Sequence, residues 1–159
     1  MTYDMTKSMP GPDNILRREF PNGMTVLAYE NMMSGTAALE GYIPAGSYLE
    51  PEGKNGLIEF LTGCLTTGTL SHDFQEINET LEEIGASLSF SAGPRSIGIS
   101  GYCLAEDLPV VLSLLREVLE EPAFPQDHFE IFRQRLYSID FFGGFSKIFF
   151  ACFEIYKAI

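Results

Sequence analysis

One segment of the chain is framed like an active site and carries almost no chemistry. It reads GLIEFLTGCLTTGT from residue 56 to residue 69, and its only acidic or basic side chain is Glu59. A lone carboxylate on a helix makes up neither a nucleophile-and-base pair nor a set of metal ligands. By itself, the segment therefore predicts a packed helix and not a metal centre.

The two histidines, His72 and His128, do not form a constellation in the sequence. They stand far apart, each at the start of a predicted helix, and neither has an evident partner. Isolated histidines at such positions are typical of capping or solvated side chains. We therefore expect neither to be a metal ligand.

A run of acidic residues offers a weak cation hypothesis. The spacing of Glu76, Glu79 and Glu82 places the three carboxylates on one face of a predicted helix, where oxygen ligands could collect a hard cation such as Ca²⁺. A solvated acidic face is the more common meaning of this pattern. The turns at 93–95 and 143–144 lack the G-x-x-x-x-G-K frame, so no nucleotide site is predicted.

Composition excludes several partners. The chain has 10 Lys plus Arg against 22 Asp plus Glu, a net charge of −12, which repels phosphate backbones and anionic lipids. We expect neither nucleic acid nor membrane as a partner. The polar N-terminus shows no export signal, and the 3 cysteines have no paired spacing, so reduced thiols and a cytoplasmic location are predicted.

Hydrophobic periodicity predicts alternating groups of strands and helices. Residues 16–20 and 24–30 flank Pro21-Asn22-Gly23 as a hairpin, and a second hairpin turns at 93–95. The remaining predicted elements are a strand at 37–45, a helix capped by Asn55, a helix from Ser71 to Gly85, strands at 87–93 and 96–105, a helix from Glu106 to Pro122, and a helix from Pro125 through Leu136.

The order β-β-β-α-α-β-β-α-α predicts an α+β fold, in which one largely antiparallel sheet has its helices packed on one face. We divide the chain into a flexible segment at 1–14, a domain at 15–139 and a Phe-rich tail at 140–159. The tail, DFFGGFSKIFFACFEIYKAI, is interrupted by two glycines and by Asp140, Lys147, Glu154 and Lys157, charges that a membrane-spanning helix could bury only at several kcal/mol.

Five ordered motifs carry a family resemblance. They are FPNGMTVL at 20–27, AGSYLE at 45–50, the helical segment at 56–69, LEEIGA at 81–86 and EEPAF at 120–124. In order and spacing this series resembles the N-terminal domain of the M16 metallopeptidases, the family of pitrilysin, insulinase and mitochondrial processing peptidase. The resemblance implies an M16 peptidase-like (LuxS-metallohydrolase-like) fold over 15–139, incomplete relative to the family.

The resemblance also implies a lost zinc site. The family's helix reads like G-x-x-H-F-L-E-H-x-x-x-x-G-T, in which two histidines bind zinc and the glutamate polarises the attacking water. Glu59 stands at the first histidine, Thr62 at the glutamate and Gly63 at the second histidine. No catalytic residue, metal ligand or cofactor is therefore expected here, and zinc is expected only in an active partner.

Two flanking features match the family without needing catalysis. Gly46, Ser47 and Glu50 match its Gly-Ser-x-x-Glu, and we expect a backbone turn at Gly46 and caps from the other two. Ser89, Phe90 and Ser91 lie in a segment that resembles the family's edge strand, which receives extended peptide by strand addition. Ser89 replaces an Asn often found there, but backbone pairing does not require that side chain.

The implied function is that of a non-catalytic subunit or fragment that pairs with an active M16 peptidase and helps bind extended basic peptides. Two alternatives stay open. One is a purely structural M16-like scaffold, and the other is a residual zinc metalloendopeptidase whose displaced site uses Glu59, His72 or the acidic helix.

The tail at 140–159 has two interpretations. Either Phe149, Phe150 and Phe153 close the core, or the chain is a fragment or an altered reading frame whose apolar surface a partner covers. We favour the second and expect a homodimer through residues 141–159 when no other partner is present.

Overall fold

The computed structural model describes residues 10–31 and 33–140. Its strands and helices follow the predicted order and are β1 (Ile15–Glu19), β2 (Thr25–Tyr29), β3 (Thr36–Ile43), α1 (Leu57–Cys64), α2 (Phe74–Glu83), β4 (Ser87–Ala92), β5 (Ile97–Leu104), α3 (Leu108–Glu120) and α4 (Gln126–Asp140). Every strand pair is antiparallel. The α+β class is therefore confirmed.

The chain divides into two compact units, residues 1–35 and 36–159. The first contains the β1–β2 hairpin, which pairs Ile15 with Tyr29 and Glu19 with Thr25. Its turn closes as predicted, because Gly23 adopts a φ of 86° and the Phe20 amide donates to the Met24 carbonyl at 2.8 Å.

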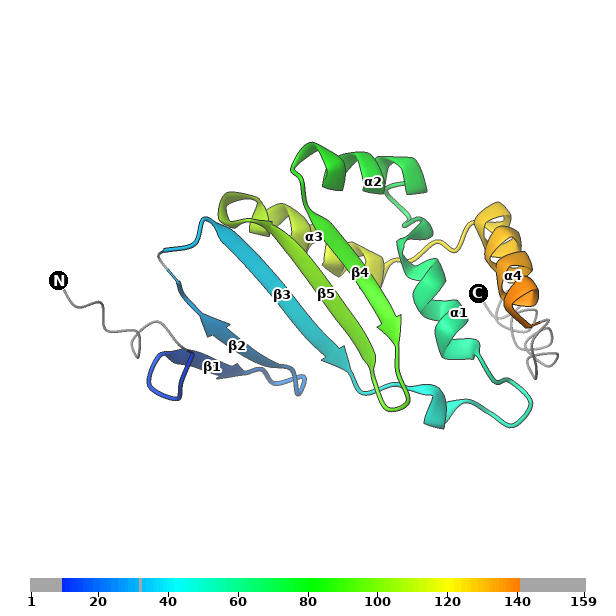
Figure 1. Ribbon diagram of the computed structural model, residues 1–159, viewed down its shortest axis with the longest axis horizontal. Coiled ribbons are helices and arrows are strands. Elements are labelled where there is room, and N and C mark those ends of the chain that lie inside the picture. The colour runs from blue at the N-terminus through cyan, green and yellow to red at the C-terminus, as the bar shows by residue number, and fades with distance from the viewer. Residues whose placement is uncertain (1–9, 32, 141–159) are drawn as a thin grey trace. The chain divides into compact units, whose positions relative to one another are not determined.

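The strands form two sheets where the sequence predicted one. β1 pairs with β2 alone, and the second sheet has the order β3-β5-β4 (Figure 1). Alternation of apolar and polar residues identifies a strand but does not specify its neighbours, which explains why the pattern could not reveal this division.

The two faces of the second sheet differ in burial. On β5, Ile97, Ile99 and Cys103 are buried, whereas Ser100 and Tyr102 between them are exposed. The register aligns Ser100 with Glu40 of β3 and with Ser89 of β4, so the exposed face carries a polar row. This alternation is expected of an antiparallel sheet with one face on the core.

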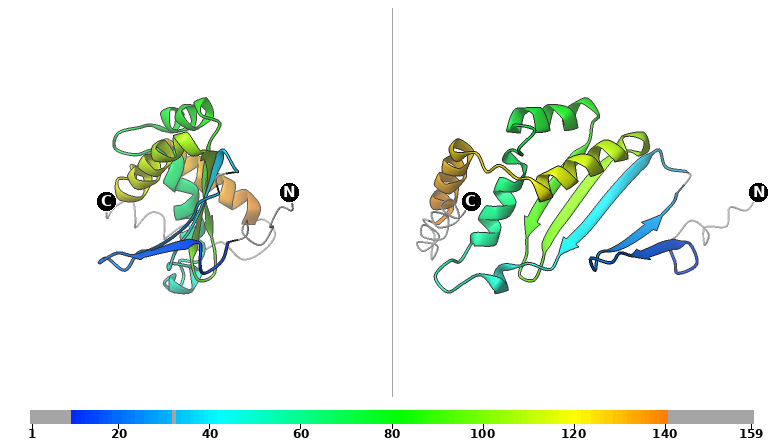
Figure 2. Two further views of the ribbon diagram at one scale, coloured as in Figure 1. Left: turned by 90° about the vertical axis from the view of Figure 1, so that its left-hand side faces the viewer. Right: turned by 180° about the vertical axis from the view of Figure 1, so that it is seen from behind.

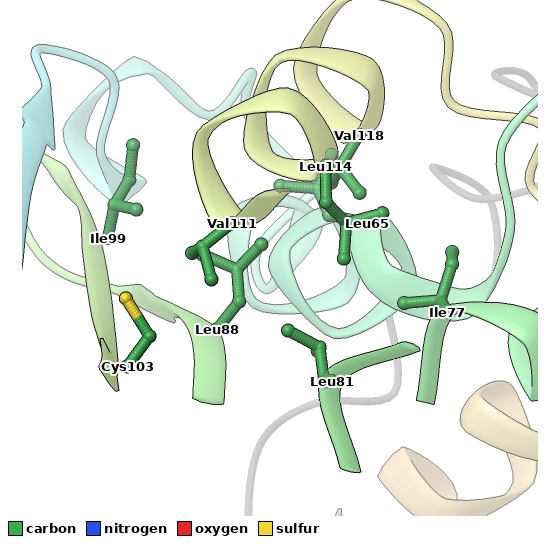
Figure 3. Packing of buried hydrophobic residues seen from close by; sticks show 9 residues of the cluster. All are labelled: Leu65, Ile77, Leu81, Leu88, Ile99, Cys103, Val111, Leu114 and Val118. Carbon is green, nitrogen blue, oxygen red and sulfur yellow. The ribbon is translucent and has the colours of Figure 1, made fainter. Parts of the chain in front are cut away.

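Helices α2 and α3 cover the buried face, as predicted, and α3 lies along the sheet (Figure 2). Val111, Leu114 and Val118 recur at helical spacing and point from α3 into the core (Figure 3). The remaining members of this cluster are Leu65, Ile77, Leu81, Leu88, Ile99 and Cys103.

The caps differ from those predicted. Helix α1 begins after Gly56 rather than Asn55, and the Glu50 carboxylate accepts hydrogen bonds from the amides of Gly56 and Ile58, each at 2.9 Å. Helix α2 begins after Asp73 rather than Ser71, and Asp73 and Glu76 form a capping box. At α1, the two hydrogen bonds to the Glu50 carboxylate confirm the cap expected of that residue.

Cys64 and Cys103 are both buried. Within residues 10–31 and 33–140, no helix combines the length and apolarity needed to cross a bilayer. Residues 141–159, on which the predicted homodimer contact depends, lie outside the described residues.

Candidate functional site on helix α1

Helix α1 carries all three positions of the degenerate zinc motif, and their side chains do not converge on a metal. Glu59 is exposed, whereas Thr62 is buried. The Thr62 hydroxyl donates to the main-chain carbonyl of Glu59 at 3.0 Å. It is therefore used within the helix, and Gly63 offers no side chain.

The space beside Gly63 is filled by an aromatic ring from α4. A Cβ atom added to Gly63 would lie 1.9 Å from Cζ of Phe132, 2.3 Å from Cε1 and 2.6 Å from Cε2. Carbon atoms pack at about 3.5–4.0 Å, so these positions cannot both be occupied. Glycine at this position is a packing requirement of the α1–α4 contact.

An aromatic cluster surrounds this contact. The ring of Phe60 meets that of Phe129 edge-on, with centroids 4.6 Å apart and an interplanar angle of 71°, and meets that of Phe132 at 5.9 Å and 85°. Phe60 and Cys64 are buried, and Phe124 packs against them. Edge-to-face geometry is favourable for aromatic pairs. The cluster accounts for the position of α4 beside α1 (Figure 1).

The residues present do not fit a zinc ion. Of the three motif positions, only Glu59 has an oxygen or nitrogen ligand that is not already hydrogen-bonded within the helix. In the described part of the chain, no group of three or more His, Cys, Asp or Glu side chains could hold a metal. The displaced metal site proposed above therefore has no ligand set there.

A second polar cluster joins the segment after α1 to α3, and sequence reasoning missed it. His72 does have a partner, contrary to expectation: its Nδ1 atom lies 2.8 Å from Oε1 of Glu117. The Thr69 hydroxyl donates to the same carboxylate and accepts from the His72 amide at 2.9 Å. These residues lie 45 and 48 positions from Glu117, too far for any local pattern to reveal.

The electrostatics of this cluster follow from its hydrogen bonds. The bond to Glu117 raises the pKa of His72 above its ordinary value, and the nearby carboxylates of Glu76 and Asp73 act in the same direction. Hydrogen bonds from Thr69 and His72 lower the pKa of Glu117. Both shifts favour the charged pair.

The other candidate ligands have structural contacts. The ring of His128 lies 4.7 Å from that of Phe74. Glu76 is engaged in the capping box, and Glu79 accepts a hydrogen bond from Gln75 at 2.6 Å. Two of the three carboxylates predicted to share a cation, those of Glu76 and Glu79, are thus engaged locally.

Gly46 is needed for close approach and not for the turn predicted there. Its backbone is extended, with φ of −136°. A Cβ atom on Gly46 would lie 2.5 Å from the main chain of Pro94 and Arg95. The amides of Ser47 and Tyr48 donate to the carbonyls of Gly93 and Pro94, each at 3.1 Å. This segment therefore docks on the β4–β5 turn.

Ser89, Phe90 and Ser91 lie on β4, which is an edge strand in the sheet order β3-β5-β4. Ser89 and Ser91 are exposed, whereas Phe90 is partly buried against the core. The Ser89 hydroxyl donates to the Ser100 carbonyl at 3.4 Å, and the Ser100 hydroxyl donates to Glu40 at 3.2 Å. The predicted strand therefore lies at an edge and has a polar exposed face.

Known proteins are similar to this chain in sequence and in fold. The mitochondrial-processing peptidase subunit beta of Caenorhabditis elegans is 32% identical over 113 residues, which cover 71% of this chain and 24% of that protein. The chain thus spans about a quarter of that relative's length.

Two solved structures share the fold. A protease from Helicobacter pylori superposes with a TM-score of 0.72 at 18% identity, over 80% of this chain and 30% of that one. The peptidase M16 inactive domain from Pseudomonas fluorescens gives 0.65 at 24% identity, over 72% of this chain and 28% of that one. The profile of the family described as Insulinase (Peptidase family M16) matches residues 25–139. The chain belongs to peptidase family M16.

Proposed function

We propose that this chain is a non-catalytic M16 domain that acts in the cytoplasm beside an active, zinc-bearing M16 peptidase. One observation carries the proposal: α1 keeps the frame of the motif, but Thr62 is bound within the helix and the space beside Gly63 belongs to Phe132. The fold shared with a structure described as an inactive M16 domain, and a relative named as a subunit, support it.

Peptide binding is the second part of the proposal. The edge strand β4 pairs with β5 on one side, and helix α1 lies on its other side (Figure 1). An edge strand has backbone donors and acceptors that an extended peptide can pair with, and this pairing needs none of the lost zinc ligands. The net charge of −12 favours a basic peptide.

Reconstitution tests the partnership. The purified chain is titrated into an M16 peptidase of the same genome that keeps both histidines and the glutamate. We expect co-elution and a higher rate of peptide cleavage. The matched control is the partner stripped of zinc, which should co-elute without cleaving. Separate elution together with an unchanged rate would contradict the partnership.

Peptide binding is tested on the chain alone. Fluorescence anisotropy of a labelled basic peptide should show saturation with the natural chain and with Ser89→Val, which keeps the backbone donor. Binding should be lost with Ser89→Pro, which removes it, provided thermal unfolding shows that the variant is folded. The absence of saturable binding to the natural chain would favour the structural scaffold.

The enzymatic alternative has its own measurement. Elemental analysis of freshly purified protein should find no stoichiometric zinc. One zinc per chain would overturn the non-catalytic assignment.

A further inference from the structure

Phe132 excludes every side chain from position 63 of α1. The direction of a Cβ atom is fixed by the backbone, so no choice of rotamer can relieve a clash that involves Cβ itself. At Gly63 that atom would lie 1.9 Å from Cζ of Phe132. Only glycine is therefore compatible with the ring in its present place.

The ring of Phe132 is partly buried and packs against the cluster of Phe60 and Cys64. Phe132 meets Phe60 edge-on at 5.9 Å, and Phe60 is 3% exposed. Phe60 also contacts Phe129 at 4.6 Å, and Cys64, 1% exposed, belongs to the same cluster. Moving the ring away would leave a cavity in this cluster, and the surrounding residues would lose their contacts.

We infer that Phe132 excludes metal from α1. Its ring, part of the aromatic cluster that packs α4 on α1, occupies the space where the family's motif would place its second histidine. Restoring metal ligands on α1 is then not enough to restore metal binding, because the ring must also be removed. The inference rests on the premise of the proposed function that α1 binds no metal, and it adds the reason why a simple reversion fails.

A double-mutant cycle on the 159-residue chain measures the clash directly. Alanine has a higher helix propensity than glycine, so Gly63→Ala should stabilise α1 wherever there is room for a methyl group. In the natural chain we expect Gly63→Ala to lower Tm. In the Phe132→Ala background the same substitution should raise Tm by roughly 2–4 °C, a reversal of sign.

Phe129→Ala is the matched control background. It removes a ring that contacts Phe60 at 4.6 Å, and that ring is not among the atoms nearest to a Cβ on Gly63. Gly63→Ala should therefore still lower Tm in this background. Equal Tm shifts in all three backgrounds would overturn the assignment of the clash to Phe132.

Zinc provides the second readout. Glu59→His with Gly63→His places two imidazoles one turn apart, a spacing that binds Zn²⁺. We expect saturating ZnCl₂ to raise the Tm of this pair only when Phe132→Ala is also present, because a ligand that binds the folded state stabilises it. The pair combined with Phe129→Ala should show no zinc-dependent shift.

Every outcome of the zinc experiment bears on the inference. A pair that binds zinc while Phe132 is intact overturns it, and so does a triple variant that takes up no zinc or folds no better than the pair. Neither result changes the fact that the natural chain lacks the zinc ligands. The proposed function is therefore tested separately, by the reconstitution and by metal analysis of the natural chain.

Discussion

Nδ1 of His72 lies 2.8 Å from Oε1 of Glu117, which ties the segment between α1 and α2 to helix α3. Because a carboxylate only accepts hydrogen bonds, His72 is the donor. The hydroxyl of Thr69 donates to the same carboxylate oxygen. Two residues of this segment and one residue 45 positions further along the chain thus form one polar contact.

This contact predicts a pH-dependent stability. The pKa of His72 is raised by Glu117, so its contribution is full below the pKa of an unfolded histidine and is lost as pH rises through the folded value. The pKa of Glu117 is lowered by Thr69 and His72, so its contribution is lost as pH falls through the folded value. The pair therefore stabilises the folded state most between the ordinary pKa of a glutamate and the pKa of an unfolded histidine.

We expect His72→Gln to lower the free energy of unfolding most near about pH 5.5 and least above about pH 8, as these pKa directions require. Urea unfolding at the two pH values measures it. His128→Gln is the control, since its ring contacts Phe74 and, among residues 10–31 and 33–140, no carboxylate is found bonded to it. A His72→Gln effect that does not change with pH would contradict the charged pair.

Thr69→Val should cost about 1–3 kcal/mol of stability, because it removes one of the two hydrogen-bond donors to Glu117 and the acceptor of the amides of Ser71 and His72. Thr69 is 6% exposed, so water does not readily replace the hydroxyl. Thr25→Val, at an exposed strand position, should change stability by less than about 0.5 kcal/mol. Equal effects of the two in urea unfolding would show that the hydroxyl of Thr69 is dispensable.

Glu50→Gln should destabilise α1 by about 1 kcal/mol. The carboxylate accepts hydrogen bonds from two amides at the helix N-terminus, and its negative charge interacts favourably with the positive end of the helix dipole. Glu52→Gln removes the same charge from a nearby exposed residue and should be close to neutral. Thermal unfolding separates the two, and a similar loss for both would indicate a general charge effect instead of a cap.

Gly46→Ala should destabilise the domain by about 1–3 kcal/mol, the usual cost of overpacking, because its Cβ would lie 2.5 Å from the main chain of Pro94 and Arg95. Gly35→Ala is the control, since a Cβ there meets nothing within 4 Å. Denaturant unfolding of both variants checks the prediction. A neutral Gly46→Ala would mean that the segment moves away from the β4–β5 turn at little cost.

The sequence by itself determined the local structure and the family. Apolar spacing predicted each strand and helix because periods of two and of 3.6 residues report which face is buried. Gly85 was predicted to end α2, and it adopts the left-handed φ of 60°. The loss of the motif residues at Glu59, Thr62 and Gly63 also needs no structure, since it is a matter of residue identity.

Only the tertiary structure decided which distant residues meet. Phe132 fills the space beside Gly63, and Glu117 binds His72. β1 and β2 form a sheet separate from β3-β5-β4. All three arrangements depend on contacts between segments far apart in the chain. Such contacts depend on how the side chains of packed elements fit together and on which polar groups find hydrogen-bond partners. The periodicity of a single sequence indicates which face of an element is buried but not which element covers it.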